Sequence, residues 1–337
     1  MMDFFNDYRK LYFTALGLFV VLTMLVAIMP AISNQNNNSP LPTEEALSEA
    51  ALAGKALYVA NGCVACHTQQ VRNLDMDKVW GKRPSIAADY ADERRTDLWR
   101  NTATLMGTER TGPDLTDVGN RQPSAEWNLL HLYQPRAVVA ESIMPAYPWL
   151  FEEKAELVEG DVEVPVPDAF RKGVKGKIVA TKDALNLVAY LQSLKQAELP
   201  GAMAAPEFLY KREVKAKAGA SGGEDMGLDG AALYAANCQS CHQASGEGLK
   251  GAFPPLKGSS IVLDDNPEVL IDVVMNGYDA RPEFASMPAI GTNMKLSAAE
   301  VTAIINHERT SWGNSARKVP VEEVQKIMDL LKQTAKK

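Results

Sequence analysis

Two copies of the pentapeptide Cys-x-x-Cys-His, at residues 63–67 and 238–242, constrain this chain more than any other feature, and they contain all four of its cysteines. This spacing is typical of c-type haem attachment, in which two thiols form thioethers with the vinyl groups of one haem and the adjacent histidine binds its iron. The sequence therefore predicts two covalently bound haems c. The predicted attachment thiols and histidine ligands are Cys63, Cys66, His67, Cys238, Cys241 and His242.

Two other uses of Cys-x-x-Cys fit this sequence less well. A structural zinc site needs four ligands, usually from two such pairs that fold together, and does not need a histidine after each pair. A thioredoxin-like redox site needs only one copy, in an α/β setting that the sequence does not show. Repetition of the whole pentapeptide favours an electron-transfer protein with two haems.

The N-terminal segment 11–32 is almost wholly apolar. At about 20 residues per bilayer crossing, this stretch is long enough to span a membrane, whereas the apolar core of a cleaved signal peptide has about 7–15 residues. Arg9 and Lys10 precede it, and the positive-inside tendency keeps that end in the cytoplasm. We expect a single-pass protein of a bacterial inner membrane, with its haem domains on the periplasmic side.

The two halves repeat the approach to the haem motif. Gly54 opens Gly-Lys-Ala-Leu-Tyr before the first motif, and Gly230 opens Gly-Ala-Ala-Leu-Tyr before the second. We expect both segments to be helices, with the glycines allowing close helix contact. Apolar residues at helical spacing predict a closing helix in each half, at 183–194 and 297–312, which crosses the first helix of its own domain.

The landmarks after each haem motif also repeat. Pro113 precedes Met144 by 31 residues, and Pro255 precedes Met287 by 32, with Pro-Ala after each methionine. Both halves resemble class I cytochromes c, in which a proline at this position supplies the carbonyl that accepts the second N–H of the haem histidine. The repeat predicts Met144 and Met287 as the sixth ligands of the two haem irons.

The remaining candidates receive structural interpretations. We expect core packing for Met76, Met106, Met275 and Met294, of which Met294 is the main competitor of Met287. His131 is expected to pack or hydrogen-bond near the first haem, and His307 to be structural. Packing is also expected for three tryptophans that are candidate propionate partners, Trp80, Trp127 and Trp149.

The expected fold is mainly α, with an N-terminal transmembrane helix followed by two class I cytochrome c domains. The expected segments are an anchor helix, a tether, a first domain with enlarged loops, a linker, a second domain and a C-terminal helix, at 1–33, 34–43, 44–197, 198–227, 228–318 and 319–337 respectively. Two long segments of the first domain, between His67 and Pro113 and from Pro148 to Ala180, are absent from the second, and long loops often contact partners.

Three motifs of the first half are more specific. They are Arg-Thr-Gly-Pro-Asp-Leu at 110–115, His-Leu-Tyr-Gln-Pro-Arg at 131–136 and Glu-Ser-Ile-Met-Pro-Ala-Tyr-Pro-Trp-Leu at 141–150. Over about residues 1–196 the chain resembles the mono-haem subunit II of cbb3-type cytochrome c oxidases, which has an anchor helix and one outward-facing cytochrome c domain. Residues 228–318 resemble a generic class I cytochrome c. The chain departs from that family by its second haem domain, which is expected either to replace the domains of a separate subunit III or to act as a docked donor.

This resemblance implies a non-catalytic electron-transfer subunit. An external donor (a cytochrome c, a cupredoxin or a bc1-type complex) would reduce the second haem, and electrons would pass to the first haem and then to a haem-copper catalytic subunit. Two alternatives stay open: the cytochrome c subunit of a haem-copper nitric oxide reductase, and a free-standing anchored carrier. A net charge of −7 without a basic run argues against nucleic-acid binding. Membrane lipid is the remaining expected partner.

Overall fold

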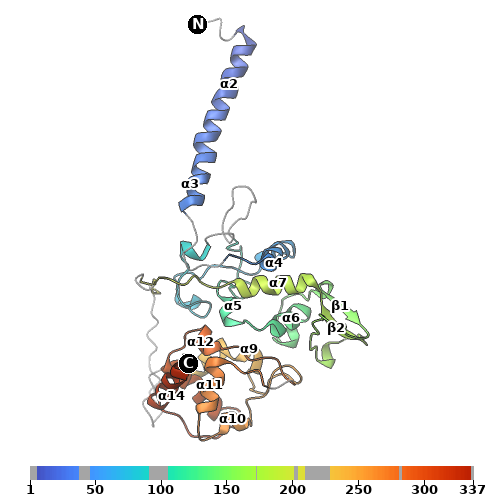
Figure 1. The fold of residues 1–337 in the computed structure, drawn as a ribbon, viewed down its shortest axis with the longest axis vertical. Coiled ribbons are helices and arrows are strands. Elements are labelled where there is room, and N and C mark those ends of the chain that lie inside the picture. Colours follow the sequence, from blue (N-terminus) through green and yellow to red (C-terminus); the bar gives the residue numbers. More distant parts are fainter. Residues whose placement is uncertain are drawn as a thin grey trace. The chain divides into compact units, whose positions relative to one another are not determined.

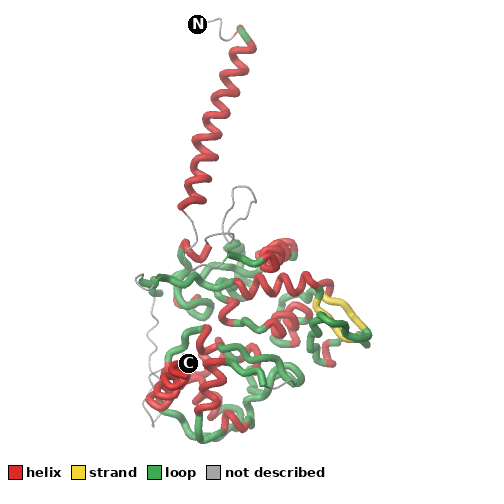
Figure 2. The backbone as a smooth tube through the Cα atoms, viewed as in Figure 1, coloured by secondary structure: helices red, strands yellow, loops and turns green. Residues whose placement is uncertain are grey.

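The computed structural model describes residues 6–37, 46–90, 105–171, 173–200, 204–208, 228–280 and 283–334. The described residues are mostly helical, as expected (Figure 2). Residues 38–43 of the expected tether, and most of the expected linker, lie outside the described part of the chain. The domain boundaries stay predictions.

Figure 1 shows one long N-terminal helix and a set of shorter helices in the rest of the described chain. Those of the N-terminal half are α2 (Tyr8–Leu22), α3 (Met29–Asn37), α4 (Glu49–Ala60), α5 (Val118–Arg121), α6 (Ala125–Tyr133) and α7 (Lys182–Ser193). Those of the C-terminal half are α8 (Gly230–Asn237), α9 (Gln239–His242), α10 (Ser260–Leu263), α11 (Glu268–Asn276), α12 (Ile290–Asn293), α13 (Ala298–Thr310) and α14 (Val321–Thr334).

Contacts divide the chain into two units, which we describe separately. The first comprises residues 1–47, 85–106 and 196–205, and the second comprises residues 48–84, 107–195 and 206–337. Both predicted haem motifs belong to the second unit. In the first unit, the carboxylate of Asp89 accepts hydrogen bonds from the backbone N–H groups of Ile86 and Ala197 and so links two of its segments.

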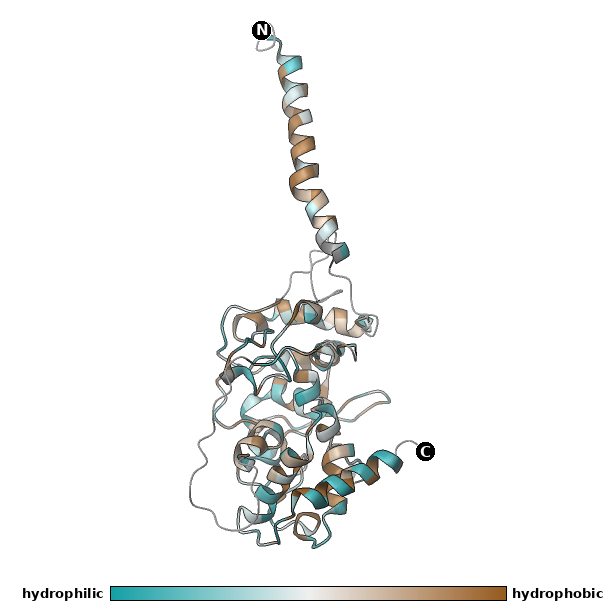
Figure 3. Ribbon diagram, turned by 90° about the vertical axis from the view of Figure 1, so that its left-hand side faces the viewer, coloured by the Kyte–Doolittle hydropathy of each residue, from teal (hydrophilic) through white to brown (hydrophobic). Residues whose placement is uncertain are grey.

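The N-terminal helix of the first unit runs from Tyr8 to Ser33, with α2 and α3 joined by a π-helical turn at Thr23–Ile28. Asp7 caps its start by accepting a hydrogen bond from the N–H of Arg9. The helix has 26 residues, its most apolar 18-residue window has a mean hydropathy of 2.6, and none of that window is buried within the protein. Figure 3 shows the apolar middle of this helix. The helix is therefore long and apolar enough to cross a membrane, as predicted.

In the part of the second unit that contains the first Cys-x-x-Cys-His motif (the first haem half), α4 and α7 cross at a glycine. A Cβ atom at Gly54 would collide with the backbone carbonyl of Asn186, so a side chain there would push the helices apart. Beside the crossing, the buried rings of Tyr58 and Tyr190 meet edge to face at 5.4 Å. The predicted crossing of the first and closing helices is confirmed here.

The second haem half repeats this crossing with α8 and α13. A Cβ atom at Gly230 would collide with the carbonyl of Ala303. Ser297 begins α13 in a capping box with Glu300, each side chain accepting a hydrogen bond from the other residue's backbone N–H. The two halves thus build the same two-helix frame, because a glycine, which has no side chain, is kept at both crossings.

An unpredicted hairpin lies in the long segment from Pro148 to Ala180. Strands β1 (Phe151–Lys154) and β2 (Lys177–Ala180) pair antiparallel, with Phe151 opposite Ala180. The hairpin ends where Thr181 caps α7 by accepting a hydrogen bond from the N–H of Ala184. This insertion is therefore a folded extension that leads directly into the closing helix.

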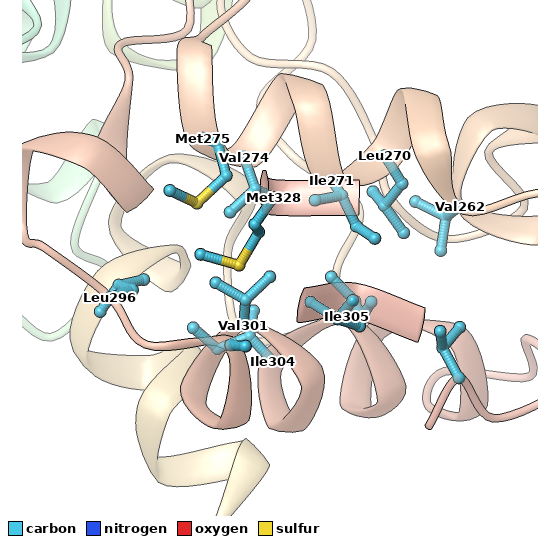
Figure 4. Close-up of a cluster of buried hydrophobic side chains, with 13 residues drawn as sticks. Val262, Leu270, Ile271, Val274, Met275, Leu296, Val301, Ile304, Ile305 and Met328 are labelled. Carbon is cyan, nitrogen blue, oxygen red and sulfur yellow. The ribbon is translucent and has the colours of Figure 1, made fainter. Parts of the chain in front are cut away.

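The C-terminal helix α14 completes the core of the second half. Val324 and Met328 are 0% and 4% exposed, and both belong to a cluster of buried side chains from α11, α13 and α14. Figure 4 shows the Met328 sulfur between the residues of α11 and those of α13. The tail, whose role the sequence left open, therefore seals a hydrophobic core.

Candidate haem sites

The first predicted ligand, His67, follows a tight 3₁₀ turn at Cys63–Ala65. Gly62 starts this turn with a φ of 70°, a conformation that suits glycine. The Nδ1 atom of His67 lies 2.8 Å from the carbonyl oxygen of Pro113, as predicted. A Cβ atom at Gly112 would fall on the imidazole ring. The Gly-Pro pair thus forms both the wall and the hydrogen-bond acceptor of this histidine, and leaves Nε2 as the nitrogen for a metal.

A buried charged network holds the Gly-Pro loop against the histidine turn. The Arg110 guanidinium lies 2.5 Å from the carboxylate of Asp77 and 3.2 Å from that of Asp114, and both acids are fully buried. It also donates a 2.8 Å hydrogen bond to the hydroxyl of Thr68. The Arg-Thr-Gly-Pro-Asp-Leu motif therefore ties three chain segments together beside the site.

The second predicted ligand, His242, is the last residue of α9 and is 6% exposed. Its Nδ1 lies 2.9 Å from the carbonyl oxygen of Pro254. The sequence analysis assigned this role to the next residue, Pro255, which it took as the counterpart of Pro113. That assignment is wrong by one residue, because the carbonyl that faces the imidazole belongs to the first proline of the pair.

His67, His242, Cys63 and Cys241 are uncharged in these surroundings. Burial lowers the pKa of His67 and of His242, although a carbonyl hydrogen bond opposes the shift in each case. Burial also raises the pKa of the Cys63 and Cys241 thiols to about 11. Neutral imidazoles suit iron binding, and protonated thiols argue against a low-pKa redox cysteine.

A cavity lies beside His242. Its lining includes Cys238, Cys241, His242 and Met287, and it encloses about 780 Å³ of space outside atoms, part of it open to solvent. Apolar side chains make up most of the remaining wall, among them Leu270, Val274, Ile290 and Ile304. Met294, the competing methionine, is not in this lining and packs on the hydrophobic cluster. The cavity brings the predicted attachment and ligand residues together and fits a haem.

The predicted first-site methionine, Met144, sits in a loop fixed at both sides. Its carbonyl accepts a hydrogen bond of 3.1 Å from Arg136, and the N–H of Tyr147 donates to the carbonyl of Leu132 at 2.9 Å. Burial and the nearby thiol of Cys63 raise the pKa of the Tyr147 hydroxyl to about 12. The loop thus runs alongside the first attachment motif.

The first half also offers a buried donor that suits a haem. The Nε of Arg121 is buried and has no hydrogen-bond partner among the described residues, while its guanidinium lies 5.1 Å from the ring of Trp80. Burial lowers the pKa of Arg121 to about 10, so the group stays charged at neutral pH. Its Nη2 donates to the carbonyl of Asp114 at 2.6 Å, so Nε is the donor left for an acceptor such as a haem carboxylate. The structure does not support the zinc alternative, since no group of three or more His, Cys, Asp or Glu that could hold a metal ion is found among the described residues.

The structural interpretations of His307 and of three methionines have mixed outcomes. His307 is structural, as predicted: its Nδ1 lies 3.2 Å from the Ser311 hydroxyl, and its ring meets Trp312 edge to face. Met275 packs in the core as expected. Core packing is wrong for Met76 and Met106, whose side chains are 68% and 40% exposed.

Trp127 has a role that the sequence did not indicate. Its ring stacks on His131 at 4.5 Å, and its indole N–H donates to the carbonyl of Ser240, inside the second attachment motif. Burial, with a smaller contribution from His67 of the first site, lowers the pKa of His131 to about 4, so this buried imidazole is neutral. No sequence signal marks the hydrogen bond from Trp127 to Ser240, since its acceptor is a backbone carbonyl 113 residues away.

Comparison with known proteins gives two family matches. The model described as "Cytochrome C oxidase, mono-heme subunit/FixO" matches residues 6–174, half of the chain. The model described as "Cytochrome C oxidase, cbb3-type, subunit III" matches residues 225–307. The two matches follow one another along the sequence, and each contains one Cys-x-x-Cys-His motif.

Individual relatives are also cytochromes c. Cytochrome c-552 of Thermus thermophilus is 37% identical over 111 residues, which are 29% of this chain and 83% of that protein. The cytochrome c subunit of the quinone alcohol dehydrogenase of Gluconacetobacter polyoxogenes is 34% identical over 113 residues, or 32% of this chain, and the match spans only 24% of that subunit. Cytochrome c domains carry covalently bound haem c. The chain belongs to the family of mono-haem subunits of cytochrome c oxidases, and a cbb3-type cytochrome c domain follows in its C-terminal part.

Proposed function

We propose that this chain is a membrane-anchored dihaem subunit that carries electrons to the catalytic subunit of a cbb3-type cytochrome c oxidase. The observation that carries the proposal is the repeated geometry of His67 with Pro113 and His242 with Pro254, each next to a pair of thiols. Cys63, Cys66, Cys238 and Cys241 would hold the two haems, and His67, Met144, His242 and Met287 would bind their irons.

The ligand set decides the chemistry. A haem iron bound by His on one face and by Met on the other has no open position for a substrate. The Met ligand raises the reduction potential of the haem relative to bis-His ligation, so such a haem would supply electron transfer alone. His67 and His242 would hold their rings in place through their carbonyl hydrogen bonds. The second domain would receive electrons from a cytochrome c, a cupredoxin or a bc1-type complex and pass them to the first.

A surface of the first half suits contact with the catalytic subunit. Val139, Ile143 and Trp149 lie near Met144 along the chain, and they are 40%, 75% and 63% exposed. Exposed apolar side chains that form a continuous surface often mark protein contacts. Members of this family are part of a terminal oxidase complex with a catalytic subunit. We propose that this surface meets that subunit and that electrons leave the chain there.

The N-terminal helix supports membrane anchoring, and the orientation is part of the proposal. Arg9 and Lys10 lie at its start, which favours a cytoplasmic N-terminus and haem domains on the outer side of a bacterial inner membrane. The match of residues 225–307 to subunit III supports a further step: the second domain would supply in one chain what a separate subunit supplies elsewhere.

Purification of the full-length protein from membranes through a tag tests this function. We expect two haems per chain, a copurified haem-copper subunit and fast oxygen uptake with a reduced donor. Nitric oxide turnover in place of oxygen uptake would assign the chain to a nitric oxide reductase. Isolation without any haem-copper subunit would make it a free-standing carrier.

A further inference from the structure

The attachment loop of the second site lies against the first domain. Ser240, between Cys238 and Cys241, is held by two side chains from that domain. The indole N–H of Trp127 donates to its carbonyl at 2.8 Å, and the amide of Gln122 donates to its hydroxyl at 3.2 Å. The loop that attaches the second haem is therefore also a protein contact.

Further contacts extend this interface on both sides of Ser240. The amide of Gln243 donates to the carbonyl of Val138 at 3.2 Å, and that of Gln122 lies 3.8 Å from the sulfur of Cys241. Gln122 is 7% exposed and also lines the cavity that contains Met287. Helices α5 and α12 touch beside it (Figure 1). A first-domain residue thus forms part of the wall of the second site.

On the first-domain side, an aromatic pair leads back to the first site. Trp127 and His131 stack with their rings 4.5 Å apart and only 13° from parallel. Helix α6, which carries both rings, also accepts a 2.9 Å hydrogen bond from the N–H of Tyr147 through the carbonyl of Leu132. The stack therefore connects the attachment loop of the second site with the helix that holds the Met144 loop of the first site.

We propose that Trp127 is the positioning residue of a fixed contact between the two haem domains, and that electrons would cross between the domains at this contact. The inference rests on the proposed two-haem function and names the place of its internal step. One electron would leave the second haem iron, which goes from ferrous to ferric, and reach the first, which goes from ferric to ferrous. No bond forms or breaks, and no proton moves.

The geometry has a consequence for the donor. Ser240 and Gln243 flank the thioether of Cys241 and are both engaged by the first domain. A donor that reduces the second haem must therefore bind another face of the second domain. Trp127 acts by holding the two domains together, and it is not a ligand of either iron.

The test measures electron equilibration between the two haems in the purified full-length protein after rapid photoreduction. Trp127→Leu removes the indole donor and the stack, whereas Trp127→Phe keeps the ring. Ser240→Arg places a charge in the interface while leaving both cysteines of the motif in place. The matched control is Gln192→Ala, because Gln192 also donates its amide to a backbone carbonyl, that of Pro123, but within the first domain.

We expect Trp127→Leu and Ser240→Arg to slow equilibration by about tenfold or more, as a disrupted interface populates undocked states. Trp127→Phe keeps the stack on His131 but loses the donor to Ser240, so its rate should lie between those of the unaltered protein and Trp127→Leu, and Gln192→Ala should keep the full rate. Haem content and both midpoint potentials should match the unaltered protein, which excludes a general loss of structure. Unchanged rates in both Trp127→Leu and Ser240→Arg, with both haems present, would overturn the proposal, as would an equal loss in Gln192→Ala. If Trp127→Leu does not fold, Ser240→Arg decides. Oxygen uptake by the unaltered complex tests the proposed function independently.

Discussion

The Nδ1 atom of His67 lies 2.8 Å from the carbonyl oxygen of Pro113, which follows it by 46 residues, and His242 repeats the contact with Pro254 across only 12 residues. The same contact between histidine and proline therefore tolerates a large insertion between these two residues. Arg110, at the end of the inserted segment, pairs with Asp77 near its start and with Asp114 just after Pro113. These ion pairs close the insertion and return the chain to the histidine in the required position. The insertion adds structure around the site without changing its ligand geometry.

Gly112→Ala tests the wall behind His67. The new methyl group would overlap three atoms of the imidazole ring, and the backbone of Gly112 is not left-handed, so lack of space is the only reason for glycine here. We expect reduced haem content at the first site and a shifted potential of any first haem that is retained. Redox titration measures both potentials, with the second haem as an internal reference. Two unshifted potentials at full haem content would contradict the geometry.

Met144→His and Met287→His test the proposed sixth ligands. Histidine in place of methionine should lower the potential of its own haem by roughly 0.1–0.3 V, within the range of about 0.8 V that axial ligands span, and should leave the other haem unchanged. Met76→His is the control, since that side chain is exposed. If either ligand variant leaves both potentials in place, the assignment of that methionine fails.

The helical frame was predictable because its signals are local. Gly54 and Gly230 stand at the same place before each haem motif, and helical spacing of apolar residues marks the closing helices. The packing of these helices across a glycine follows from those two facts alone. The histidine and cysteine candidates were equally local, because covalent attachment requires all of them within five residues.

Features that depend on distant backbone atoms escaped prediction. Nothing in the sequence distinguishes the carbonyl of Pro254 from that of Pro255, and only the folded loop decides which one faces His242. The contact of Trp127 with Ser240 uses a backbone acceptor, so no partner side chain signals it. Met76 was expected in the core because apolar composition does not report which loop residues face solvent.

Asp77→Asn tests the network that holds the inserted segment. Burial alone would raise the pKa of Asp77, but hydrogen bonds from Arg72 and Arg110 outweigh it and lower that pKa below its usual value. A lowered carboxyl pKa contributes stability above the unfolded value of about 4, and this contribution is lost as the pH falls through the folded pKa. We expect the substitution to cost about 3 kcal/mol of unfolding free energy at pH 7, and less at acidic pH.

Denaturant unfolding at pH 7 and pH 3 measures this difference. Asp161→Asn is the control, because Asp161 pairs with Lys154 near the surface and its loss should have a much smaller effect. An Asp77→Asn protein as stable as the unaltered one at pH 7 would mean that the network does not hold the loop.

Met328→Ala tests whether α14 seals the second core. Met328 is 4% exposed among the side chains of α11 and α13, and removing a buried methionine side chain costs about 2–5 kcal/mol. Leu330→Ala is the matched control on the same helix, since that side chain is 50% exposed, and its cost should stay within about 0.5 kcal/mol. Thermal unfolding of both variants checks the prediction, and equal losses would count against the packing.

Glu308 gives the second domain a specific pH dependence. This carboxyl is 3% exposed, lines the cavity beside His242, and burial raises its pKa to about 8 from an ordinary value of 4.5. Between these two values the folded chain keeps a proton that the unfolded chain has lost. Stability therefore falls as the pH rises through this window, by at most about 1.4 kcal/mol per pH unit, and levels off above the folded pKa.

Glu308→Gln removes that proton equilibrium while keeping a neutral side chain of similar size in the cavity. We expect the variant to lose less stability than the unaltered protein between pH 5 and pH 8, measured by denaturant unfolding of the haem-loaded protein. Glu322→Gln, on the exposed side of α14, is the control and should leave the pH profile unchanged. Parallel profiles for Glu308→Gln and the unaltered protein would show that the Glu308 carboxyl is already ionised in the folded state, which would require a cation or water beside it.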